Sequence, residues 1–332
     1  MALFSNKKYF KPGKGVEKDE PEKHAFFKFF ELFFRKFWKY LEVNLAYFLI
    51  LLPIILYIYA AVYDASYYLL SDMGFTQEEI ETVWTPLLYS ATLYISRVPS
   101  YIRNVLLLVS ALAYGPVKCG VTYVLRNFSS EHHSWISDIW DKARENWKYG
   151  MLFGIVDILA VLIVVFNFSY SAAGQGILKV SRYITLLLLL LYCFMRRYIY
   201  LMIVTVDLDL RSLLINAWLL SFVGIFRNVG SMLLNALLWL GSYLLILLLL
   251  PIAEAILLPC LLLSLTNFIA VFACYPMVDQ YLVQAMENLT EEEKAALQAQ
   301  QEEKQAKLEE KKAKKASKKK RSKKDKFNNY YD

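Results

Sequence analysis

Uncharged apolar stretches of about twenty residues recur through the middle of the chain, and they restrict its possible folds more than any other feature. The first covers residues 45–63, a run without one charged side chain. A helix needs about 20 apolar residues, each rising about 1.5 Å, to cross the ~30 Å hydrocarbon core of a bilayer. Lipid offers no partner for backbone N–H and C=O groups, so such a segment has to be helical. The sequence predicts an all-α, multi-pass membrane protein.

Six segments are long and apolar enough to span, and three of them contain one or two charged residues. The second contains Gly115-Pro116, which is expected to interrupt its helix near the middle. The acidic stretch 64–100 follows the first segment and is expected to be an extracytoplasmic insertion, whose apolar patch 85–96 is too short to span. The expected spans are 45–63, 104–125, 150–170, 183–206, 231–250 and 256–276.

Charge is concentrated at the two ends. Residues 1–40 carry ten Lys/Arg against five Asp/Glu, and residues 287–332 carry fourteen against ten. Basic residues flanking apolar spans mark the cytoplasmic side of a membrane. We therefore expect a cell-membrane protein with both termini in the cytoplasm. The expected parts are a polar tail at 1–24, an interfacial amphipathic helix at 25–42, a membrane domain at 43–285, and a charged tail at 286–332, helical at first and then lysine-rich.

Three segments have the alternation of a helix lying on the membrane surface. In 25–42, phenylalanines occupy one half of a helical wheel and mainly basic residues the other, a pattern typical of interfacial helices. The connections 134–148 and 207–220 predict elbow helices at the inner surface. They either dock a cytosolic partner or pack on the membrane. Their candidate docking residues are Trp135, Trp140, Trp147, Asp207, Asn216 and Trp218.

Four charges fall inside the spans, where charge is costly and faces a partner or water. Asp157 lies in the third span, Lys118 follows Gly115-Pro116, and Arg196 and Arg197 lie in the fourth. We expect Asp157 to pair with one of the three cations. The cluster is either a polar pathway or ligand site, or an ion pair that locks helices together.

Catalytic and cofactor motifs are missing from the sequence. It contains neither a G-x-x-x-x-G-K-[ST] phosphate loop nor H-E-x-x-H nor G-x-S-x-G. The cysteines have no metal or disulfide spacing. We therefore expect no enzyme, no cofactor, no metal and no nucleotide site. The basic cluster between Lys318 and Lys324 is either a solvated tail or a site for anionic lipid or RNA.

Several short motifs spread over residues 10–285 together resemble the YesL-like family of bacterial multi-pass membrane proteins. The residues that carry the resemblance are Pro12-Gly13-Lys14-Gly15-Val16, Phe26 to Glu31, Arg35 to Lys39, Gly115-Pro116, Thr122 to Phe128, Trp135 to Trp147, Tyr200 to Thr205, Asp207-Leu208, Asn216-Ala217, Asn267-Phe268 and Tyr275-Pro276. This chain departs from the family pattern at Lys118, at Arg196-Arg197 and in its long basic tail.

The resemblance implies a membrane protein of uncharacterised activity, encoded near carbohydrate importers of the ATP-binding-cassette type. An accessory component of carbohydrate uptake, contacting importer subunits, is thus the leading expectation. One alternative is a stand-alone transporter whose polar path is lined by Lys118, Asp157, Arg196 and Arg197. The other is a lipid- or ribosome-associated factor that acts through the basic tail.

Overall fold

The computed structural model describes residues 24–72, 74, 76, 78, 98–171, 177–248 and 261–287. Within these ranges the chain forms helices and turns and no strand, as predicted. It divides into two units, residues 1–276 and 277–332, which are described separately. The expectations for 1–23, for 85–96 and for the basic cluster 318–324 lie outside the described residues.

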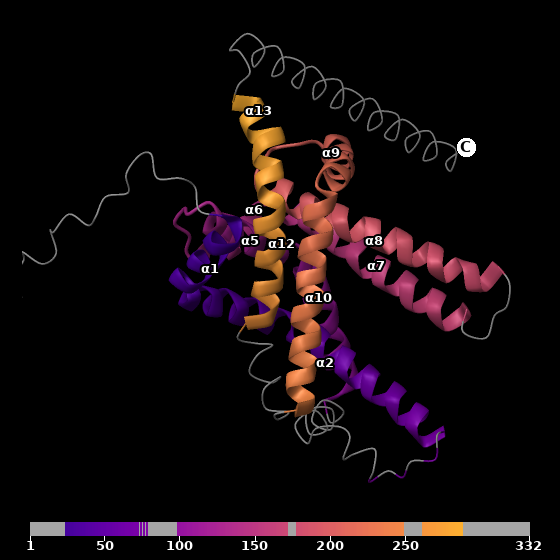
Figure 1. Ribbon diagram of the computed structural model, residues 1–332. Coiled ribbons are helices and arrows are strands. Elements are labelled where there is room, and N and C mark those ends of the chain that lie inside the picture. The colour runs from indigo at the N-terminus through magenta and orange to yellow at the C-terminus, as the bar shows by residue number, and fades with distance from the viewer. Residues whose placement is uncertain are drawn as a thin grey trace, which may run out of the picture. The chain divides into compact units, whose positions relative to one another are not determined.

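Nine described helices lie in the first unit, except for the last two residues of the ninth (Figure 1). Its elements are α1 (Ala25–Arg35), α2 (Phe37–Asp72), α5 (Ser100–Ser129), α6 (Ser137–Glu145), α7 (Trp147–Ser171), α8 (Ile177–Ile203), α9 (Leu210–Val223), α10 (Ile225–Leu248) and most of α12 (Leu263–Val278). In the second unit a π-helix (Asp279–Val283) leads into α13 (Gln284–Glu287), and the Gln284 amide donates to the Asp279 carboxylate over 2.8 Å.

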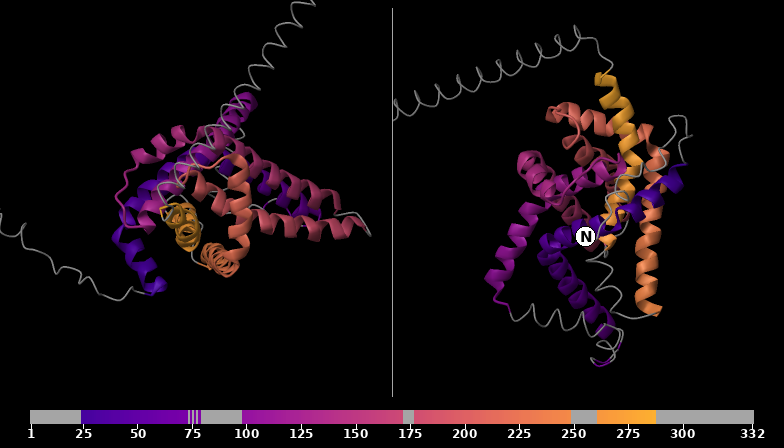
Figure 2. Two further views of the ribbon diagram at one scale, coloured as in Figure 1. Left: turned by 90° about the horizontal axis from the view of Figure 1, so that it is seen from above. Right: turned by 90° about the vertical axis from the view of Figure 1, so that its left-hand side faces the viewer.

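Four described helices are long and apolar enough to cross a membrane: α2, α5, α7 and α8. The pair α9 and α10, bent by 81°, raises the number to five if it counts as one span (Figure 2). Between 22% and 44% of each of the four apolar windows is buried within the protein. So much apolar surface facing outward is expected when the surrounding solvent is lipid. The sixth predicted span begins outside the described residues.

Two expected boundaries were wrong. The helix predicted at 25–42 ends at Arg35, and a second helix starts at Phe37, because the backbone leaves helical geometry at Lys36. The Lys36 ammonium is drawn toward the Phe128 carbonyl of α5, 3.4 Å away, which fixes the turn. The second helix then continues without a break through the first predicted span to Asp72, into the stretch expected to be a loop.

The expected interruption at Gly115-Pro116 was also wrong, since α5 runs unbroken from Ser100 to Ser129. A proline inside a membrane helix removes one backbone hydrogen bond, and packing against neighbouring helices can offset that loss. Here α7 supplies the packing. Gly150 and Gly154, one helical turn apart on α7, lie directly against Gly115 and Pro116.

The contact between α5 and α7 is made by main chain on both sides. An ideal Cβ on Gly154 would lie 2.8 Å from the Gly115 Cα, and one on Gly150 would lie 2.7 Å from the Pro116 Cα. Neither position leaves room for a methyl group unless the helices separate. Two glycines four residues apart are a recurrent device for close packing of membrane helices. The α7 segment from Gly150 to Gly154 is such a pair.

Replacing Gly154 by alanine should lower the free energy of unfolding by about 1–3 kcal/mol, because backbone atoms of α5 would have to move. Thermal unfolding in detergent micelles measures the change. Gly241→Ala on α10 is the matched control, since a Cβ there meets nothing within 4 Å. Equal melting temperatures for the two variants would contradict the tight α5–α7 contact.

Candidate functional site

Asp157 is the centre of a polar cluster between α5, α7 and α8. The residue is 6% exposed. Its Oδ1 accepts a hydrogen bond from the Tyr192 hydroxyl at 2.6 Å, and its Oδ2 accepts one from the Tyr200 hydroxyl at 2.9 Å. The Arg196 Nε also lies 2.6 Å from Oδ1, an ion pair that is close but not aligned as a hydrogen bond. Of the three predicted partners, the structure pairs Asp157 with Arg196.

The same arginine connects the cluster to α5. A terminal nitrogen of Arg196 donates to the Tyr114 hydroxyl, and the guanidinium lies 5.7 Å from the centre of the Tyr200 ring. Tyrosines therefore surround the ion pair and contribute both hydroxyl groups and ring faces. Sequence reasoning missed Tyr114, Tyr192 and Tyr200. The spacing of Tyr192, Arg196 and Tyr200 at four-residue intervals would have placed them on one face of a helix.

Arg197 points elsewhere, because successive residues of a helix lie about 100° apart. One of its terminal nitrogens donates to the Asn228 carbonyl at 3.1 Å and to the Ser231 hydroxyl at 2.5 Å, both on α10. Asn228 in turn donates its amide to the Ser221 carbonyl of α9 at 3.0 Å, across the sharp bend. Arg197 thus holds α8 against the α9–α10 corner and is not part of the Asp157 cluster.

The corner itself requires a glycine. Gly224 stands between α9 and α10, and a Cβ there would collide with the Tyr198 hydroxyl of α8. A helix, Leu210–Val223, lies where the elbow was predicted at 207–220, and its position at the inner membrane surface stays a prediction. Asp209 precedes it, but its side chain makes no capping hydrogen bond. The helix that contains most of the fifth expected span, 231–250, is α10, and it starts earlier than that span, at Ile225.

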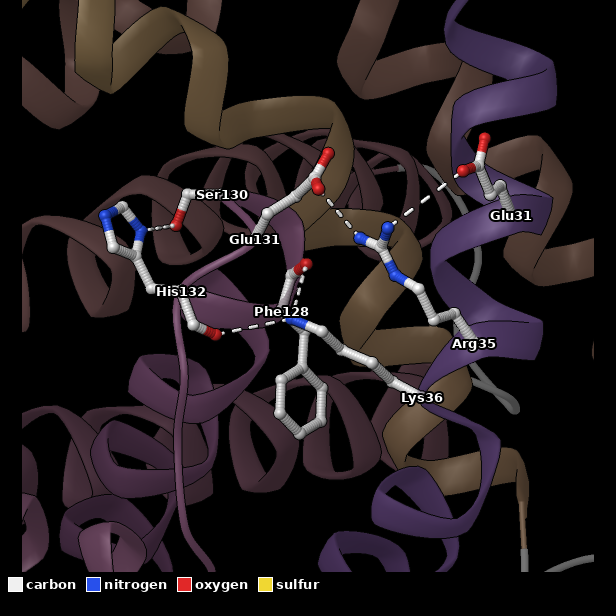
Figure 3. A network of polar contacts seen from close by, with 7 residues as sticks. All are labelled: Glu31, Arg35, Lys36, Phe128, Ser130, Glu131 and His132. Carbon is white, nitrogen blue, oxygen red and sulfur yellow. Dashed lines mark hydrogen bonds and ion pairs between the residues drawn. The ribbon is translucent and has the colours of Figure 1, made fainter. Parts of the chain in front are cut away.

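A second polar network ties α1 to the connection between α5 and α6 (Figure 3). Arg35 lies between two carboxylates, with one terminal nitrogen 4.0 Å from Glu31 and the other 2.8 Å from Glu131. Lys36 donates to the carbonyls of Phe128 and His132 at 3.4 and 3.3 Å. The network therefore fastens the start of the first apolar helix to the end of α5.

Two groups of this network have shifted pKa values. The hydrogen bond from Arg35 holds the pKa of Glu131 below its usual range. Partial burial, reinforced by the charges of Arg35 and Lys39, lowers the pKa of Lys36 to about 8. Glu131 also has a φ of 64°, which is uncommon outside glycine. Such a backbone persists where its surroundings hold it, and here Arg35 does so.

The first predicted elbow, 134–148, is shorter than expected. Its helix is α6, Ser137–Glu145, and Trp147 already belongs to α7. Ile139 and Ala143 are buried, whereas the three tryptophans of this segment are exposed. Lys39 donates to the Ser134 carbonyl at 3.3 Å and lies 5.3 Å from the Trp135 ring. The candidate docking residues that are exposed are Trp135, Trp140, Trp147, Asp207 and Trp218, while Asn216 is partly buried.

Four described helices, or five if the bent pair counts as one span, are long and apolar enough to cross a membrane, as expected of a helical membrane protein. No protein-family model, no curated protein and no solved structure matches the chain. The resemblance to the YesL-like family therefore stays a prediction. Within the described residues, no group of three or more His, Cys, Asp or Glu side chains could hold a metal ion.

Asp157→Asn should lower the free energy of unfolding by about 3–5 kcal/mol, because the mostly buried Arg196 side chain would lose its carboxylate partner. Combining it with Arg196→Gln should recover part of the loss. Thermal unfolding in lipid nanodiscs is the measurement, and Asp141→Asn on the exposed side of α6 is the control. A fully stable Asp157→Asn protein would argue against a helix-locking pair.

Glu131→Gln should weaken the attachment of α1 in a pH-dependent way. A carboxyl whose pKa is lowered on folding stabilises the folded state above its unfolded pKa of about 4.3, and this contribution is lost as pH falls through the folded value. The pair is half exposed, so the effect is small, about 0.2–1 kcal/mol. Hydrogen exchange of the α1 amides should be faster in the variant at pH 7, and the difference should shrink toward pH 4. An unchanged difference across that range would exclude the Arg35–Glu131 pair as the cause.

Proposed function

We propose that the chain is a non-enzymatic membrane component that docks a cytosolic partner subunit through α6 and its flanking tryptophans. The observation that carries the proposal is that one side of α6 is packed tightly against the protein while the other side exposes an aromatic side chain. Its buried edge, Ile139 and Ala143, faces the protein, and a Cβ on Gly120 of α5 would meet the Ile139 backbone. Its other side leaves Trp140 exposed. A rigid helix with exposed tryptophan is suited to binding a partner.

The membrane arrangement that goes with this proposal has six spans and both termini in the cytoplasm of a cell-membrane protein. The basic residues before the first span and after the last support that orientation through the positive-inside rule. Lys142, Arg144 and Lys148 support a cytoplasmic position for α6 by the same rule. In the same arrangement α1 lies in the interface, with four exposed phenylalanines toward the lipid: Phe26, Phe27, Phe30 and Phe34.

The partner we propose is a subunit of an ATP-binding-cassette carbohydrate importer. This step rests on the resemblance to the YesL-like family alone. The geometry contributes the kind of surface: a short helix next to an apolar helix of spanning length, presenting aromatic rings. The segment before this helix is held by hydrogen bonds from Lys36 and Lys39. The second elbow, α9, would add Trp218, whose ring packs edge-on against Phe222 with centroids 4.8 Å apart.

Two alternatives have separate consequences. A stand-alone transporter would use the charges at Lys118, Asp157, Arg196 and Arg197, and neutralising Asp157 would abolish transport while the fold persists. The three contacts already made to Asp157 favour a structural role instead. A lipid- or ribosome-associated factor would act through the tail, and deletion of 318–326 would abolish its function and release its partner.

Trp140→Ala should reduce recovery of importer subunits at least tenfold when the tagged protein is purified from its own membranes with a mild detergent, because an exposed aromatic anchor is lost. Quantitative mass spectrometry of the co-purified proteins is the readout. Trp239→Ala on α10 is the matched control, since the two tryptophans are 45% and 44% exposed and Trp239 lies on a lipid-facing span.

A wild-type preparation that carries no stoichiometric partner would overturn the docking proposal. Equal recovery by Trp140→Ala and Trp239→Ala would move the docking site away from α6. Recovery of ribosomal proteins that depends on 318–326 would support the tail alternative.

A further inference from the structure

Lys118 is a buried cation with too few acceptors. It lies in the middle of α5 and is 9% exposed. Its ammonium has three N–H groups, and within the described residues one acceptor lies in hydrogen-bond range, the Asn267 Oδ1 of α12 at 3.4 Å. That amide is oriented by its own donation to the Leu263 carbonyl at 2.7 Å. A charge in an apolar interior is stable when it is paired and fully hydrogen-bonded, which Lys118 is not.

Two tyrosine rings join Lys118 to the Asp157 cluster. The ammonium lies 5.3 Å from the centre of the Tyr200 ring and 5.9 Å from that of Tyr114. Arg196 contacts the same two tyrosines, the first through its ring and the second through its hydroxyl. Lys118 and Arg196 are therefore neighbours, although they come from different helices.

The charges of this group do not balance. Among the described residues that contact Arg196 and the surrounding tyrosines, the acidic side chain is Asp157. Arg196 already neutralises its carboxylate. Lys118 adds a further positive charge, with the negative faces of two rings as its main compensation. The Arg196 side chain is 28% exposed, so it is reachable from outside the protein.

We propose that Lys118 and Arg196 bind an anionic oxygen ligand, a phosphate or carboxylate, at this position between α5, α8 and α12. The anion supplies the missing acceptor for the Lys118 ammonium, and a free N–H of the Arg196 guanidinium completes its hydrogen bonds. Its source is either the head group of an anionic lipid or a soluble organic anion. The site is independent of the docking surface on α6.

The test compares melting temperatures in nanodiscs of phosphatidylcholine with and without phosphatidylglycerol, and in phosphatidylcholine with added inorganic phosphate. A ligand that binds the folded state raises the wild-type melting temperature by about 5 °C near saturation. Lys118→Met should lose the rise and Lys118→Arg should keep much of it. Lys148→Met, which removes an exposed cation at the start of α7, should retain it.

A rise with phosphatidylglycerol alone identifies a lipid head group, and a rise with inorganic phosphate identifies a soluble anion. No rise with either probe overturns the site, as does a full rise in Lys118→Met. If Lys118→Met does not fold, the lipid source is tested by measuring the phospholipid phosphorus that co-purifies with Arg196→Lys and with Lys148→Met. The proposal requires less phosphorus in Arg196→Lys than in Lys148→Met. Equal amounts in the two variants contradict it.

Discussion

The ion pair between Asp157 and Arg196 is the interaction on which the arrangement of α5, α7 and α8 depends. Lipid does not drive helices together as water does, so packing and polar contacts have to hold a bundle. The carboxylate accepts from two tyrosines of α8 and meets an arginine of the same helix, which reaches across to Tyr114 of α5. Because the group is buried in an apolar interior, removing one member leaves the others unsatisfied. Three helices are thereby held in one register.

Glycines allow this polar centre to form. Gly115 lies three residues before Lys118, and Gly154 lies three residues before Asp157, so the backbone contact and the polar cluster are one turn apart on both helices. Close approach of α5 and α7 brings Asp157 within reach of an arginine that also contacts α5. The polar contacts supply specificity, and the glycine contact supplies the short interhelical distance that they require.

The sequence predicted the helical class, helices long and apolar enough to span a membrane, and a cationic partner for Asp157 without saying which of three, because long apolar runs and buried charges have few physical solutions. It failed where tertiary contacts decide the local structure. The turn at Lys36 depends on carbonyls about ninety residues away, and the continuity of α5 through Pro116 depends on α7. The tyrosines around Asp157 were missed because an aromatic residue in a span usually indicates packing. The exposure of Trp140 could not be predicted from a helical wheel, because a wheel describes one helix and not the neighbours that cover it.

The main-chain contact between α5 and α7 has a consequence for how this sequence can vary. Most helix interfaces absorb substitutions, since a neighbouring side chain can change rotamer or shrink to compensate. At Gly115, Gly150 and Gly154 the opposing atoms are backbone, so no neighbouring side chain can compensate for a larger residue. A larger residue at any one of these three positions would therefore push α5 and α7 apart and move Asp157 away from its partners. The three glycines together set how little substitution this interface tolerates.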